Sequence, residues 1–207
     1  MKIIEPSFSI ETEINGDYIL KFIERAGRTC YKSDDIITDS SAYRFISSII
    51  KNGHESVLEH FNITVRIICD RGVSHEIVRH RLASYSQEST RYCNYYNDKF
   101  GNEITVIRPY YWKDDEIKYK IWIETMQIIE TNYMKLIELG TKPEEARSIL
   151  PNSLKTEIVV TMNLREWRHF LKLRTSVKSH PQMREISIPI LNTFKDAIPI
   201  IFDDINV

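Results

Sequence analysis

Glycine is scarce in this chain, since its 207 residues contain only six. Neither a G-x-G-x-x-G fingerprint nor a Walker loop occurs, which excludes a glycine-rich phosphate cradle. Cysteine is also rare: Cys30, Cys69 and Cys93 are widely spaced and form no C-x-x-C pair. A disulfide framework and a zinc knuckle are therefore not indicated. If the protein binds nucleotides, side chains must hold the phosphates.

Other patterns that define common protein classes are missing too. There is no G-x-S-x-G elbow and no H-E-x-x-H, and neither His75/His80 nor His54/His60 has the i, i+4 spacing of a helical metal site. No window approaches the roughly 20 apolar residues of a membrane span, and no signal-peptide pattern is present. The net charge of −1 gives no overall attraction to nucleic acid or membranes. We expect a reduced, cytoplasmic protein with no metal site.

Hydrophobic periodicity predicts an α+β protein, a single domain over residues 1–207 of mixed helices and antiparallel-type sheet. The predicted strands are 61–69, 104–108 and 154–162, with a turn at 70–72. The predicted helices are 17–28, a second helix capped by Asp39 or Ser40 and ended by Gly53, 73–82, 113–139, one starting near Pro143, 163–174, and 183–201 with an interruption at Pro189. A polar loop is expected after Leu82.

The densest chemical signal is the segment 79–92, RHRLASYSQESTRY. Arginine recognises phosphate and carboxylate groups with two parallel hydrogen bonds, and hydroxyl and amide groups can read a base edge or a sugar. On a helix end, Arg79, His80 and Arg81 would point about 100° apart and would suit a long ligand or two ligands. A lone R-H-R would more simply complement the helix dipole, but Ser89 and Arg91 behind it favour a binding role.

Three further residues are candidates for ligand binding because of the residues around them. His54 follows the helix stop at Gly53, although a lone histidine there is usually structural. Arg147 lies among apolar residues and must either snorkel or meet an anion. Arg174 ends an apolar helical stretch, where it can also complement the helix dipole.

Several elements together resemble one known family. Arg79-His80-Arg81, seven residues and then Ser89 match the R-H-R-x7-S signature of the flavin-dependent thymidylate synthases. The stretches 53–60 (GHESVLEH), 146–151 (ARSILP) and 163–174 (NLREWRHFLKLR) are similar to that family's other elements, in the same order. The first 50 residues match only loosely.

The resemblance implies the thymidylate synthase-complementing fold, assembled as a homotetramer whose sites are shared between subunits. It implies reductive methylation of dUMP to dTMP, with bound FAD, NADPH as reductant and 5,10-methylenetetrahydrofolate as carbon donor. The implied FAD contacts are His54, Ser56, Arg79, His80, Arg81, Gln87, Asn163, Leu164, Arg165 and His169. The implied dUMP contacts are Glu76, Arg79, Gln87, Glu88, Ser89, Thr90, Arg91, Arg147 and Arg174.

By the same resemblance, Arg174 has the catalytic role, because it would polarise the uracil ring. The chain departs from some members of the family at Glu76 and Gln87, and in the longer stretch 175–182. The alternative hypothesis is a non-enzymatic nucleotide- or RNA-binding module, with the R-H-R cluster and Tyr92, Tyr95 and Tyr96 as its phosphate and stacking surface. The nearly neutral charge counts against this alternative.

Overall fold

The computed structural model describes residues 1–207 and contains two sheets. The strands are β1 (Lys2–Ile4), β2 (Ser7–Ile10), β3 (Asn62–Asp70), β4 (Ala83–Gln87), β5 (Thr105–Ile107) and β6 (Lys155–Asn163). A four-stranded sheet has the order β2-β3-β6-β4, and β1 pairs with β5 in parallel. Hydrogen bonds join Leu164 to Phe61 at one end of the β3–β6 pair and Arg71 to Leu154 at the other, so these central strands are antiparallel.

Helices supply most of the remaining structure. The α-helices are α1 (Gly16–Arg28), α2 (Ser41–Lys51), α3 (Arg71–Ile77), α4 (Glu116–Glu138), α5 (Pro143–Ala146), α6 (Leu164–Arg174), α7 (Pro181–Ala197) and α8 (Pro199–Phe202). Short 3-10 turns are η1 (Thr29–Tyr31), η2 (Asp34–Ile36), η3 (Glu55–His60), η4 (Asp98–Phe100), η5 (Tyr110–Trp112) and η6 (Arg147–Ile149). No helix is both long enough and apolar enough to cross a membrane.

Contacts divide the chain into two compact units. One comprises residues 1–7, 67–79 and 85–159, and the other comprises residues 8–66, 80–84 and 160–207. We call them the α4 unit and the α6 unit after their principal helices. The boundaries fall within β2, β3, β4 and β6, so each strand of the larger sheet has residues in both units. The predicted α+β class with an antiparallel sheet is confirmed, whereas the single domain over residues 1–207 stays a prediction.

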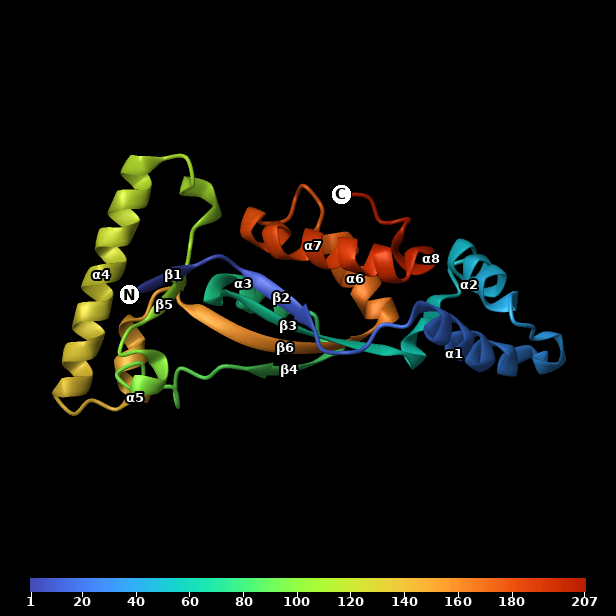
Figure 1. Cartoon of the computed structure of the whole chain (residues 1–207), viewed down its shortest axis with the longest axis horizontal. Helices are drawn as coiled ribbons and strands as arrows, with labels where there is room; N and C mark the ends of the chain where they lie inside the picture. Colours follow the sequence, from blue (N-terminus) through green and yellow to red (C-terminus); the bar gives the residue numbers. More distant parts are fainter. The chain divides into compact units, whose positions relative to one another are not determined.

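The core of the α6 unit is aromatic. Trp167 and Phe170 on α6 are fully buried, and the Trp167 ring meets Phe194 of α7 edge to face at 5.3 Å. Phe194 in turn packs on Phe202 of α8. Figure 1 shows α6, α7 and α8 gathered in one group, coloured orange to red. This packing holds α6 firmly, and α6 carries several of the predicted site residues.

The core of the α4 unit forms beneath the long helix α4. Trp122, Met126 and Tyr133 of that helix are buried together with Tyr95 and Leu154. The indole of Trp122 donates a hydrogen bond to Ser153 Oγ at 3.1 Å. Buried positions spaced by four and seven residues are what a helix with one apolar face requires.

Asparagine and aspartate side chains cap the starts of several helices, among them α1, α3 and α6. The side chain of Asn15 accepts a hydrogen bond from Tyr18 N in α1, and that of Asp70 accepts one from Val73 N in α3. Asn163 caps α6 by accepting from Glu166 N at 2.8 Å. Each cap satisfies a backbone donor that the first helical turn leaves free. The predicted starts near residues 17 and 163 are confirmed for the same reason.

Four predicted details are wrong. Residues 70–72 form no turn, because Asp70 ends β3 and caps α3 directly. Helix α3 ends at Ile77 rather than at Leu82, and the expected polar loop contains strand β4. Helix α7 also continues through Pro189 and ends at Ala197. The buried face of α7 offsets the hydrogen bond that proline cannot donate, since tertiary packing outweighs local propensity.

Candidate functional site

The R-H-R segment lies in the connection between α3 and β4. Arg79 and Arg81 are exposed, whereas His80 between them is buried. The expected fan of three side chains around a helix is therefore wrong, because the helix has already ended at Ile77. In a non-helical connection one side chain can turn inward while its neighbours turn outward. The two arginines keep access to solvent and to anions, and the histidine becomes part of the protein interior.

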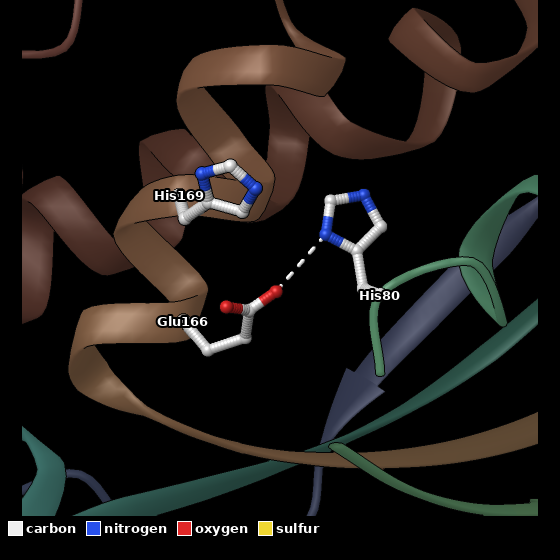
Figure 2. A group of neighbouring side chains, drawn as sticks. All are labelled: His80, Glu166 and His169. Atoms are coloured by element: carbon white, nitrogen blue, oxygen red, sulfur yellow. Dashed lines mark hydrogen bonds and ion pairs between the residues drawn. The ribbon is translucent and has the colours of Figure 1, made fainter. Parts of the chain in front are cut away.

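His80 lies in a buried row of polar side chains within the α6 unit. Its Nδ1 is 3.0 Å from Glu166 Oε1, a contact drawn as a dashed line in Figure 2. On the other side of the ring, Arg174 Nε donates to Nε2 at 3.1 Å. Glu166 belongs to the first turn of α6, and Arg174 is the last residue of the same helix. The ring of Phe170 packs edge-on against the imidazole at 4.8 Å. One short helix thus holds His80 from both sides.

The two hydrogen bonds define the tautomer of His80. Arginine has no acceptor and stays protonated, so His80 Nε2 must offer its lone pair to Arg174. The ring proton then resides on Nδ1, which donates to the Glu166 carboxylate. Burial lowers the pKa of His80, and the Arg174 and His169 charges act in the same direction, against the raising effect of the Glu166 hydrogen bond. His80 is therefore neutral at neutral pH.

A pocket of about 540 Å³ opens beside α6 in the same unit. Asn163, Arg165, His169 and Lys172 of the α6 segment contribute polar groups to it, and Leu82 contributes an apolar wall. Glu55 and Glu59 of η3 also line it. Among the predicted flavin contacts, the structure brings Asn163, Arg165 and His169 together at this pocket.

The cations at the pocket differ in how firmly they are held. Arg165 pairs with Glu59 at 2.6 Å, and about half of each side chain is exposed. Arg168, by contrast, is buried and is fixed by Glu55 and Asp204. Exposed pairs contribute little to stability, so an incoming anion could take Glu59's place at Arg165. Arg168 belongs to the core and is not offered to a ligand.

The remaining predicted flavin contacts in this unit vary in accessibility. His54 and Ser56 are exposed at the start of η3, which packs against α6. Leu164 is fully buried, and its backbone N–H donates to Phe61 O, so its side chain cannot reach a ligand. Arg81 is exposed, and Arg79 belongs to the α4 unit.

Most predicted dUMP contacts lie in the α4 unit. They are Glu76, Arg79, Gln87, Glu88, Ser89, Thr90, Arg91 and Arg147. Gln87 Nε2 donates to Ser74 Oγ and Thr156 Oγ1, which leaves its carbonyl oxygen as the atom able to accept from a ligand. Glu88 accepts from Tyr95 and forms an ion pair of 2.6 Å with Lys155.

Two arginines of this set, Arg91 and Arg147, are available to anions. Arg91 is exposed and pairs with the exposed Glu144 at 3.0 Å. Arg147 is exposed at the start of η6, so it has not buried its charge among the apolar residues around it. Arg174, the remaining predicted dUMP contact, lies in the α6 unit beside His80.

Glu166 is a residue of the site that the sequence did not single out. It occupies the third position after the Asn163 cap, where an acidic residue ordinarily serves the helix terminus. Because this local role accounts for an acidic residue at that position, the sequence provides no reason to expect its contact with His80, 86 residues away. The capping pattern was visible in the sequence, but the partner of the carboxylate was not.

His80, Glu166 and His169 also form a group that could hold a metal ion, since one ligand atom of each lies within 4.8 Å of the others. A cation bound between them would need a lone pair on His80 Nδ1. That nitrogen carries the ring proton, and the Arg174 guanidinium already occupies the other side of the ring. The hydrogen bonds therefore favour a fixed polar row over a metal centre.

The chain thus combines an α+β sheet with exposed arginines and a polar pocket along α6, and guanidinium groups are side chains that suit phosphate. The profile of the family described as thymidylate synthase complementing protein matches residues 17–200, and the chain belongs to that family. The predicted family resemblance is thereby confirmed.

Curated relatives support the same assignment. A flavin-dependent thymidylate synthase of Geobacter sulfurreducens is 36% identical over 86% of this chain and 78% of its own. One of Mycolicibacterium vanbaalenii is 33% identical over 98% of this chain and 85% of its own. Among solved structures, a UMP/dUMP methylase, PolB, from Streptomyces cacaoi bound with 5-Br dUMP has a TM-score of 0.79 at 21% identity, covering 98% of this chain and 96% of that one. This structural similarity concerns the fold.

Proposed function

We propose that this protein is a flavin-dependent thymidylate synthase, which converts dUMP to dTMP with 5,10-methylenetetrahydrofolate as carbon donor and NADPH as reductant. The observation that carries the proposal is the gathering of the family's motif residues around α6: His80 meets Arg174, and Asn163, Arg165 and His169 line one pocket. Family membership and the names of the curated relatives support it.

The residues present fit FAD, which carries two phosphate charges and a long polar chain. The α6 pocket offers Arg165, Lys172 and the exposed His169 as donors, while Asn163 adds an amide. Arg165 can exchange Glu59 for a phosphate at little cost, because their pair is exposed. His54, Ser56, Arg79, Arg81 and Gln87 complete the proposed flavin contacts, whereas the predicted contacts His80 and Leu164 are buried. When bound, FAD supplies the redox chemistry that transfers reducing equivalents to the pyrimidine.

The α4 unit offers the groups expected for a pyrimidine nucleotide. Exposed Arg91 and Arg147 suit the 5′-phosphate of dUMP, since a guanidinium forms paired hydrogen bonds to phosphate. The carbonyl oxygen of Gln87 can accept a hydrogen bond from the base or sugar, and the hydroxyl of Ser89 can accept or donate one. Glu76, Arg79, Glu88 and Thr90 belong to the same proposed set.

Arg174 has the proposed catalytic role. Its guanidinium is half-buried and held by His80, so its remaining N–H groups are oriented before any substrate arrives. A positive group aimed at the uracil stabilises negative charge that develops on the ring during reaction. Its Nε–H donates to His80, and we assign the contact with the base to the terminal nitrogens.

Assembly as a homotetramer with sites shared between subunits is part of the proposal, as is a cytoplasmic location. A protein that works this way should need no nucleic-acid partner and no membrane.

The test is direct. Purified protein should absorb as a flavoprotein, release FAD on denaturation, and form dTMP from dUMP only when NADPH and methylenetetrahydrofolate are both present. Omitting each co-substrate in turn provides the matched control. A colourless protein that does not bind added FAD would rule the proposal out.

A non-enzymatic nucleotide- or RNA-binding module remains the alternative of a different class. Its stacking surface would need Tyr92, Tyr95 and Tyr96, but Tyr95 is buried against Phe100 and Tyr133. Tyr92 and Tyr96 are exposed. Since one of the three rings is unavailable for stacking, the structure favours the enzyme.

A further inference from the structure

The row formed by Glu166, His80 and Arg174 joins the two ends of α6 through one imidazole. Glu166 is fixed at the first turn, where Asn163 caps its backbone N–H. Arg174 is fixed at the last residue, where Ser187 Oγ donates to its carbonyl oxygen at 2.9 Å. The backbone at both ends is thus held, and the hydrogen bond from Nε to His80 is a contact that directs the Arg174 side chain.

Two of the three side chains in this row are screened from water. Those of His80 and Glu166 are 4% and 9% exposed. The groups that face the imidazole are the Glu166 carboxylate, the Arg174 guanidinium, the His169 ring at 5.5 Å and the apolar Phe170 ring. In such surroundings the Glu166 carboxylate, 3.0 Å away, is an acceptor that keeps the ring proton on Nδ1.

We propose that Glu166 is a positioning residue for Arg174. By holding the His80 proton on Nδ1, Glu166 leaves Nε2 as an acceptor that aims the guanidinium. If that proton moved to Nε2, the ring would present a donor to Arg174 Nε–H, and the contact would be lost. An arginine aimed in advance loses fewer rotamers on binding than a free one, so its contact with a nucleotide is stronger.

The role in catalysis rests on the proposed function, because Arg174 must meet dUMP for its direction to matter. The hydrogen-bond row itself can be tested without substrate. One experiment therefore tests the hydrogen-bond row and another tests dUMP binding, so failure of the row is distinguishable from failure of the proposed function.

The first experiment is nitrogen NMR of the full chain labelled at histidine and arginine, without ligands. We expect a neutral His80 ring protonated at Nδ1 and a slowly exchanging Arg174 Nε–H. Arg174→Lys assigns the arginine signal. In Glu166→Ala the Nε–H signal should lose its protection, whereas Glu138→Ala, which removes an exposed carboxylate of α4, should change neither signal. An unchanged signal in Glu166→Ala, or a wild-type ring protonated at Nε2, would overturn the inference.

The second experiment is calorimetry of dUMP binding to FAD-loaded protein. Glu166→Ala should weaken binding by about tenfold, which is the size expected for one charge-assisted hydrogen bond. The double variant Glu166→Ala/Arg174→Ala should bind no more weakly than Arg174→Ala alone, since Glu166 acts through Arg174. Losses that multiply in the double variant would show that Glu166 has another, structural role.

Glu166→Gln guards against a folding failure of the alanine variant. Its amide oxygen still accepts from Nδ1 but carries no charge, so the loss in dUMP affinity should be smaller than in Glu166→Ala and should again vanish in an Arg174→Ala background. If wild-type protein binds FAD but no dUMP, the proposed function falls while the NMR result still decides the role of Glu166.

Discussion

At the scale of single residues, the arginines with access to anions differ in their surroundings. Arg147 is exposed, whereas Arg174 is half-buried and already bonded to His80. An arginine that is held before binding contributes more per contact than one that must be ordered. The two positions therefore allow the contribution of prior orientation to be measured.

Arg147→Ala and Arg174→Ala should each weaken dUMP binding while FAD content stays unchanged. Loss of a charge-assisted hydrogen bond costs about 1.5–3 kcal/mol, or more than tenfold in affinity. Calorimetry and the flavin absorbance of the same sample provide the two readouts. Arg44→Ala, which removes an exposed arginine of α2, is the control. Normal dUMP dependence in both variants would mean that these residues do not contact the nucleotide.

Ser89 completes the signature but has no partner able to activate it as a nucleophile. Its hydroxyl accepts from Arg91 N at 3.3 Å, and no carboxylate or imidazole hydrogen-bonds to it. A serine needs a base to remove its proton. Burial raises the pKa of the Cys69 thiol, so the cysteine inside the core offers no thiolate nucleophile either.

Ser89→Ala should therefore keep measurable turnover at saturating dUMP, with a raised dUMP requirement. Arg174→Ala should lose far more turnover under the same conditions. Steady-state assays, together with mass spectrometry of enzyme trapped during reaction, measure both effects. A pyrimidine adduct on Ser89, or a folded, FAD-loaded and wholly inactive Ser89→Ala, would contradict the binding role.

At the scale of elements, α6 is anchored by two arginines of different kinds. Arg168 is 1% exposed and binds Glu55 of η3 and Asp204 near the chain's end. Arg165 pairs with Glu59 of η3 at the surface. Removing one partner of a buried pair leaves charges without compensation, whereas a surface pair is worth little.

Arg168→Met should lower the free energy of unfolding of the ligand-free protein by about 3 kcal/mol. Arg165→Met should lower it by less than about 1 kcal/mol, and it serves as the matched control on the same helix. Urea unfolding followed by circular dichroism gives both values. Equal losses in the two variants would show that burial does not distinguish the pairs.

The elements also show what the sequence could predict. Helices α1, α4 and α6 and strands β3 and β6 were predictable, because their apolar periodicity and caps are local signals. Strand β4 was not, since Ser84, Ser86 and Gln87 are poor strand formers and only pairing in the sheet makes them extended. The early end of α3 and the inward turn of His80 likewise depend on contacts far away in sequence.

The candidate site likewise has features that the sequence predicts and features that only the fold reveals. Motif spacing identified Arg79, His80, Ser89, Arg91, Arg147 and Arg174 as chemically important. It could not show that His80 is buried or that Glu166 fixes its proton, because both facts depend on the packing of α6 against the R-H-R connection. Residue identity was readable in the sequence, whereas orientation required the fold.

At the scale of the whole molecule, the exposed apolar side chains bear on how many chains assemble together. The chain leaves several large apolar side chains exposed, including Ile117, Ile121 and Ile128 on α4. Exposed isoleucines spaced by four and seven residues share one side of the helix, and large apolar side chains so placed are suited to meet another protein surface. Light scattering should therefore give the mass of a tetramer at micromolar concentration, and a fully active monomer would contradict this.

Shared sites make a sharper prediction than mass alone. If the Arg147 and Arg174 that serve one nucleotide come from different subunits, a tetramer mixed from Arg147→Ala and Arg174→Ala chains contains some sites with both arginines intact. Random mixing gives such sites about a quarter of the time, because each residue is wild type in half of the chains. Differently tagged variants should be co-expressed, purified through both tags and assayed for dTMP formation.

The mixed tetramer should recover roughly a quarter of wild-type turnover, although each variant alone is impaired. A mixture of Arg174→Ala with His80→Ala chains is the matched control. Arg174 and His80 bond to each other within one chain, and every chain in this mixture lacks one of the two residues. No site in the mixture therefore contains the intact Arg174–His80 hydrogen bond. Recovery in the first mixture and not in the second would place the site across the subunit boundary. No recovery in the first mixture, with a tetrameric mass, would mean that one chain supplies both arginines.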